Sequence, residues 1–146
     1  MSASQHAIDL ARIAAGAAAE VKATSITAID VSERLLITDV FLVISGSTDR
    51  QVRALVDAVD QALAKVGCDR IQREGYDPSP HWVLIDYDEI IVHVLQDEDR
   101  EFYELEKLWG DCPQIDLQLE EERADVARGD VARAAVSLGE EAVSDS

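Results

Sequence analysis

Apolar positions recur at helical spacing in two segments of the chain. Residues 5–22 place Ile8 and a series of alanines on one stripe, a pattern typical of an amphipathic helix that packs closely through small side chains. In residues 49–66 the apolar positions step by three or four along one face, and each of residues 47–49 can cap the start. We therefore expect two amphipathic helices.

Five shorter segments have strand patterns. Residues 23–31 alternate apolar with polar positions, as in a strand with one solvated face, whereas residues 39–45 are almost continuously apolar, as in a strand covered on both faces. Residues 70–73 form a weaker strand candidate. Residues 82–85 and 90–95 are dense apolar runs around a short polar interval, which predicts an antiparallel hairpin. The fold class expected is α/β (α+β), with a mixed central sheet of about five strands flanked by helices.

The last third of the chain divides into a predicted helix and an acidic tail. Residues 97–109 carry an apolar stripe behind an acidic first turn, which favours a helix. Residues 113–146 contain nine acidic residues against three arginines, no aromatic residue and few aliphatic ones, too little apolar surface to offset the entropy of folding. We expect a domain over residues 1–112 and a disordered or transiently helical tail over residues 113–146.

Composition narrows the classes of function. The 146 residues suffice for one ordinary domain, and a net charge of −17 repels phosphate backbones, so little or no direct nucleic-acid binding is expected and a basic protein partner is favoured. No apolar run is long enough for a membrane helix, and the N-terminus is a poor secretory signal, which predicts a cytoplasmic protein. Cys68 and Cys112 have no metal-site spacing and are expected to be reduced thiols.

Two features could belong to a catalytic site. Asp86 and Asp88 have the spacing of carboxylates that hold magnesium, and Gly46-Ser47 resembles the helix start of nucleotidyltransferases. In that superfamily the acidic pair follows the Gly-Ser by roughly a dozen residues, whereas here it arrives 40 residues later in a hairpin turn. We expect solvated turn acids, no metal, no cofactor and no enzyme activity; magnesium-dependent nucleotide turnover that Asp86→Asn abolishes is the alternative.

Histidine and glycine patterns add no catalytic motif. His6, His81 and His93 lack a second ligand at metal-site spacing, and His93, inside an apolar run, is expected to be a satisfied, half-buried strand residue. The backbone N–H groups of residues 46–48 could hold an anion, but helix capping alone explains them.

The few aromatic residues gather between Tyr76 and Trp109. Trp and Tyr supply large, rigid contact areas at protein interfaces. Tyr87, flanked by acids in a turn, is expected to be exposed, and Trp82 begins the same hairpin, whereas Phe102 and Trp109 are assigned mainly to the core. An exposed Trp/Tyr surface bordered by acids suits a basic protein partner.

Four blocks of the sequence resemble the ribosomal silencing factor family, also called Iojap-like proteins. They occur in order over DVFLVISGSTDRQVRAL (residues 39–55), whose first block begins one residue earlier at Thr38, and EGYDPSPHWVLIDYDEIIVHVLQDEDREFYELEKLWGD (residues 74–111). The blocks are a T-D-x-F segment, a W-x-L-I-D-Y hairpin, a V-H-V strand and an R-x-F-Y-x-L-E-x-L-W helix. The similarity covers about residues 5–112.

The resemblance implies a role in translation. Members are similar to nucleotidyltransferases without the catalytic acids, bind ribosomal protein L14 on the large subunit, sterically block association with the small subunit under nutrient limitation, and are homodimers when free. Carried over to this sequence, the expected contact residues are Trp82, Asp86, Tyr87, Asp88, Asp97, Glu98, Arg100, Tyr103 and Glu104. Trp82 and Tyr87 would be the apolar anchors, and the acids would pair with Lys and Arg of the ribosomal protein.

Two departures from the family pattern leave questions open. The turn over residues 86–89 carries Asp where the family usually has Gly before the acid, and Asp adopts a left-handed backbone less easily than Gly, so the family pattern does not determine the shape of this turn. Family members commonly end near the last predicted helix, and one hypothesis for the additional tail is that it inhibits binding by imitating ribosomal RNA.

Overall fold

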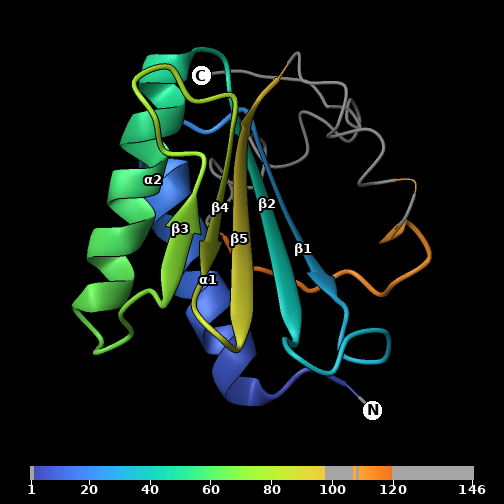
Figure 1. Cartoon of the computed structure of the whole chain (residues 1–146). Helices are drawn as coiled ribbons and strands as arrows, with labels where there is room; N and C mark the ends of the chain where they lie inside the picture. The colour runs from blue at the N-terminus through green and yellow to red at the C-terminus, as the bar shows by residue number, and fades with distance from the viewer. Residues whose placement is uncertain (1, 98–106, 108, 120–146) are drawn as a thin grey trace.

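The molecule is built on a five-stranded sheet with two helices on one of its faces (Figure 1). The computed structural model describes residues 2–97, 107 and 109–119. The elements follow one another as α1 (Gln5–Glu20), β1 (Ser25–Asp30), β2 (Val40–Gly46), α2 (Asp49–Ala64), β3 (Gln72–Glu74), β4 (Trp82–Asp86) and β5 (Ile90–Gln96).

The sheet mixes strand directions, as predicted. Its order is β1-β2-β5-β4-β3, in which β2 and β5 are parallel and the other three pairs are antiparallel. Every residue of β2 is buried, which explains the nearly continuous apolar run in the sequence. The predicted hairpin of β4 and β5 is confirmed, whereas β3 begins two residues later than the strand predicted at residues 70–73.

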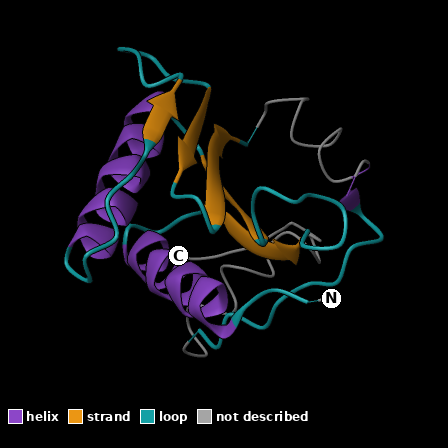
Figure 2. Cartoon of the chain, turned by 60° about the horizontal axis from the view of Figure 1, so that its bottom comes forward, coloured by secondary structure: helices purple, strands orange, loops and turns teal. Residues whose placement is uncertain are grey.

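Both helices lie on the same face of the sheet (Figure 2). Ser4 caps α1 and Thr48 caps α2, each side chain accepting a hydrogen bond from a backbone N–H in the first turn. The buried face of α1 consists mostly of alanine, and small side chains let the helix approach its neighbours closely. The buried residues of α2 are Val52, Leu55, Val56, Val59 and Leu63, the stripe read from the sequence.

The segment after Cys112 runs along the outer edge of β1. The N–H of Asp30 donates to the carbonyl of Pro113 at 2.8 Å, and the N–H of Ile115 donates to that of Ala28 at 2.9 Å. Three aliphatic side chains of this segment pack against the core between helices and sheet: Ile115, Leu117 and Leu119. The packed chain therefore continues past the domain boundary predicted after residue 112, and residues 120–146 of the predicted tail lie outside the described residues.

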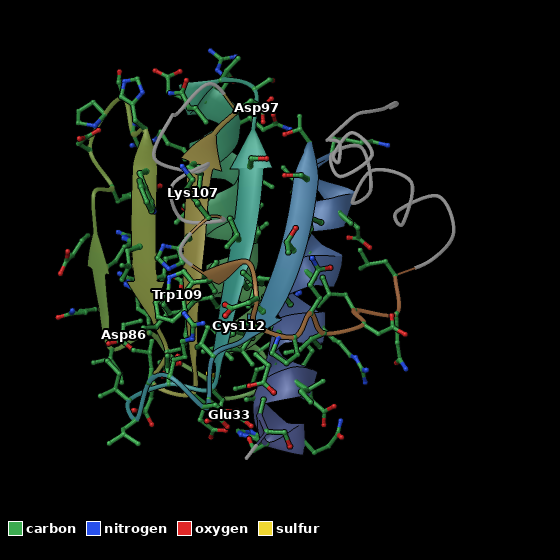
Figure 3. The ribbon with its side chains drawn as sticks, turned by 90° about the vertical axis from the view of Figure 1, so that its right-hand side faces the viewer. Glu33, Asp86, Asp97, Lys107, Trp109 and Cys112 are labelled. Carbon is green, nitrogen blue, oxygen red and sulfur yellow. The ribbon has the colours of Figure 1, made fainter. Side chains whose placement is uncertain are left out.

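The opposite face of the sheet carries an aromatic contact. Trp109 lies over this face (Figure 3), its ring 5.3 Å from that of Phe41 in an edge-to-face arrangement. Most of the helix predicted over residues 97–109, including Phe102, lies outside the described residues. Within the described part of the chain, no helix is both long and apolar enough to cross a membrane.

Candidate functional site

Trp82 begins β4 on the sheet face away from the helices. The neighbouring Val83 and Ile85 are fully buried toward the helices, so the alternation of the strand turns Trp82 to the other side, where it is half-buried. Its indole N–H donates to Nδ1 of His93 on the adjacent strand at 3.1 Å, and the two rings meet edge to face. Trp82 therefore combines exposed aromatic surface with a fixed orientation.

His93 is buried, not half-buried as predicted. Its exposed fraction is 5%, its ring lies 4.9 Å from that of Phe41, and Nε2 has no hydrogen-bond partner within the described part of the chain. Burial lowers the pKa of His93 to about 4, because the charged imidazolium loses its hydration. At neutral pH the ring is uncharged, and the hydrogen bond from Trp82 places the imidazole proton on Nε2.

Tyr87 lies inside the molecule, and the expectation that it is an exposed anchor is wrong. Its exposed fraction is 4%, and its hydroxyl donates to Oδ1 of Asp60 on α2 at 2.8 Å. Asp60 also pairs with Arg70 through its other oxygen. Burial, and then the hydrogen bond to Asp60, raise the pKa of Tyr87. The acids beside Tyr87 suggested a solvated turn, but its ring folds back and ties the turn to α2.

Asp86 and Asp88 shape the turn between β4 and β5. Oδ1 of Asp86 accepts the N–H of Asp88 at 2.8 Å, and Asp88 has a φ of 76°, a left-handed conformation that Asp tolerates. Asp88 is exposed and Asp86 is half-buried. The turn over residues 86–89 is thus stabilised by the Asp86 side chain, and it presents carboxylates to solvent.

Asp97 lies at the other end of the sheet from this turn (Figure 3). Asp86 pairs with Ile91, and Asp97 follows the far end of β5, so the two acids are separated by about 20 Å of strand. The N–H of Asp97 donates to the carbonyl of Gly46 at 2.8 Å, and its carboxylate accepts from the Thr24 hydroxyl. Four predicted contact residues lie outside the described residues: Glu98, Arg100, Tyr103 and Glu104.

Gly46-Ser47 is likewise remote from the acidic turn, so the nucleotidyltransferase arrangement does not form. Gly46 pairs with Gln96, at the far end of the sheet. The N–H of Ser47 is occupied by Oε1 of Gln51 at 2.8 Å, and the Gln51 amide also donates to the end of the α1 segment. Capping therefore accounts for this loop. The described residues include no group of three or more metal-ligating side chains.

One exposed apolar pair was missed by sequence reasoning. Leu36 is fully exposed and Ile37 is 72% exposed, at the tip of the loop between β1 and β2. We call these two residues the loop tip. The loop joins the acidic turn through a hydrogen bond from the Asp39 N–H to the Glu89 carbonyl at 3.0 Å. The available signal was a run of aliphatic residues at 35–37 inside a segment without strand or helix periodicity.

Comparison with known proteins gives a consistent result. Residues 4–139 match the family model described as "Ribosomal silencing factor during starvation". Ribosomal silencing factor RsfS of Bacillus subtilis is 38% identical over 106 residues, covering 73% of this chain and 89% of that protein. The protein of the same name from Halalkalibacterium halodurans is 34% identical over 110 residues, covering 75% and 93%.

A solved structure shares the fold. The crystal structure of a protein from Bacillus halodurans superimposes with a TM-score of 0.66 at 31% identity, covering 77% of this chain and 99% of that one. The family match spans most of the sequence, and the mixed five-stranded sheet with its β4–β5 hairpin agrees with the fold class expected from the sequence. The chain belongs to the ribosomal silencing factor family.

Proposed function

We propose that this protein represses translation by binding ribosomal protein L14 on the large ribosomal subunit and sterically blocking association with the small subunit when nutrients are scarce. It acts as a cytoplasmic binding protein, a homodimer when free, and not as an enzyme. Family membership supports the ribosomal role. The observation that carries the binding mode is the half-exposed Trp82, held by His93 on a sheet face that ends in acids.

Charge supports a protein ligand over RNA. With a net charge of −17, the chain repels phosphate and attracts a basic protein surface. Trp82 would supply the apolar anchor, and Asp86 and Asp88 would pair with cations at the rim. Tyr87 would contribute by holding the turn in shape, because its ring is buried against α2.

Sedimentation of the full chain with purified large subunits tests the proposal. We expect co-sedimentation, and a smaller joined-ribosome peak after small subunits are added. Trp82→Ala should weaken binding to isolated L14 by at least about 1 kcal/mol, roughly fivefold in Kd, as for a central aromatic residue of an interface.

Tyr76→Ala is the matched control, since Tyr76 is a half-buried aromatic residue whose hydroxyl bonds Asp57 of α2. It should leave the affinity within about twofold, and urea unfolding of both variants separates lost folding from lost contact. A wild-type chain that stays at the top of the gradient and leaves subunit joining unaffected would refute the proposed function.

A further inference from the structure

The loop that carries the loop tip is ordered by its own hydrogen bonds. The N–H of Val31 donates to the carbonyl of Asp39 at 2.9 Å and closes the loop, and the N–H groups of Arg34 and Leu35 both donate to the Val31 carbonyl at 2.9 Å. Leu35 packs against the cluster of Ile29, Val31 and Phe41, and Thr38 is buried. Residues on both sides of the loop tip therefore point inward and hold Leu36 and Ile37 out in solvent.

The surroundings of the loop tip are acidic. The turn over residues 86–89 is bonded to the base of the loop, and Glu33 lies at the same end of the sheet as Asp86, away from Asp97 (Figure 3). Two basic side chains at this end of the sheet, Arg34 and His6, are paired with acidic residues. Arg34 pairs with Asp111 at 2.5 Å, and His6 lies 2.8 Å from Glu89.

The loop tip, an apolar projection bordered by carboxylates, is complementary to one kind of partner surface. It fits an apolar recess flanked by Lys and Arg on a basic protein, whereas the carboxylates repel an RNA backbone. Because the loop is already ordered, binding would cost little additional conformational entropy. The loop tip and Trp82 are separated by the length of β4, about 13 Å, along the strands, and by the two interstrand spacings from β2 to β4, about 10 Å, across the sheet. A standard interface of about 800 Å² per partner spans both.

We propose that Leu36 and Ile37 form a second anchor, which inserts into an apolar recess of the same basic ribosomal protein that Trp82 contacts. This inference rests on the proposed function and adds a site to it. The loop tip makes the contact, and the acids at residues 86–89 orient the approach. Because Leu36 is fully exposed and Ile37 is 72% exposed in the single chain, their replacement should alter binding and leave the fold of the chain intact.

The test is the double variant Leu36→Ser/Ile37→Ser in the full-length chain. Its matched control is Val66→Ser/Ile71→Ser, which removes two other exposed aliphatic side chains, at 54% and 63% exposure, on the segment between α2 and β3. Dissociation constants are measured against purified large subunits, isolated L14 and protein-free ribosomal RNA, and the free energy of unfolding is measured in urea. We expect the loop-tip variant to bind large subunits and L14 about tenfold more weakly and to unfold like wild type, and the control to bind within about twofold.

Each contrary result has a distinct meaning. A loop-tip variant that binds as tightly as wild type, while Trp82→Ala binds weakly, overturns the second anchor and leaves the proposed function standing. A loss of affinity that also appears with protein-free RNA overturns the protein recess as the occupant. A wild-type chain that binds neither large subunits nor L14 refutes the proposed function, and the second anchor with it.

Discussion

At the scale of single residues, His93 occupies a position that an apolar side chain would fill at lower cost. Its Nε2 is buried without a partner within the described part of the chain, a situation that typically costs about 1–3 kcal/mol. What it provides is an acceptor for the indole N–H of Trp82. The sequence placed His93 correctly on a strand, but burial depends on Phe41 and Trp82, which only the fold brings around it.

The buried imidazole predicts a specific pH dependence of stability. The pKa of His93 is lowered to about 4 in the folded protein, so between pH 6.5 and 4 the unfolded chain binds the proton more readily. Protonation of the unfolded chain therefore lowers the free energy of unfolding as the pH falls below 6.5, by about 2 kcal/mol between pH 7 and pH 4.5, and has little effect above pH 6.5. His93→Phe removes it, so the variant should gain stability relative to wild type as the pH falls.

Urea unfolding followed by circular dichroism at pH 7, 6, 5 and 4.5 measures the difference. His81→Phe, which removes an exposed histidine, shows whether the loss of any imidazole gives the same result. If the free energies of unfolding of wild type and His93→Phe change equally with pH, the buried His93 is not the source of the pH dependence.

At the scale of elements, the sequence predicts a helix or strand best where burial of that element alone sets its pattern of apolar residues. The stripe of α2 and the apolar run of β2 follow from burial of one helix face and of both strand faces, and both were read directly. The segment over residues 113–119 was missed because it has no partner nearby in sequence. Its alternation of Ile115, Leu117 and Leu119 is short and acidic in context, and it becomes meaningful only against the edge of β1.

This edge contact predicts that the C-terminal segment contributes to folding stability. Ile115→Ala removes a half-buried side chain from the core and should lower the free energy of unfolding by about 1–2 kcal/mol. Hydrogen exchange of the Asp30 amide, which donates to Pro113, should accelerate in the same variant. Gln114→Ala is the matched control, since Gln114 is exposed between the same two hydrogen bonds. Equal stability and exchange in both variants would show that the segment adds nothing to the fold.

At the scale of the whole molecule, the net charge agrees with the proposed basic partner, while the fold places the predicted contact residues at two opposite ends of the sheet. Composition alone indicated a basic protein ligand, and the four sequence blocks indicated the family. Neither could show that Asp86 and Asp97 lie at opposite ends of the sheet, because their separation depends on the direction of β5. Asp86 and Asp88 border the loop tip, whereas Asp97 follows the end of β5 whose residue Leu95 pairs with Trp82, so one acidic group lies beside each proposed anchor.

Electrostatic guidance of this kind predicts how association depends on salt. Long-range attraction between opposite charges acts mainly on the association rate and is screened within about 8 Å at physiological ionic strength. The association rate constant with L14 should fall about tenfold between 50 and 500 mM NaCl, with little change in dissociation. At low salt Asp86→Asn/Asp88→Asn should slow association about two- to fivefold, because it removes two of the charges that attract the basic partner. Asparagine keeps the side-chain acceptor and tolerates the left-handed backbone of this turn.

Glu74→Gln/Asp77→Asn changes the same charge farther from the acidic turn, since Glu74 pairs with Leu84 in the middle of β4, and should slow association less. Stopped-flow fluorescence of Trp82 in a Trp109→Phe background, or surface plasmon resonance, provides the rates. If the two double variants slow association equally, the attraction arises from the net charge of −17 as a whole. A larger effect at Asp86 and Asp88 locates the approach at the acidic turn, beside the loop tip, where the second anchor requires it.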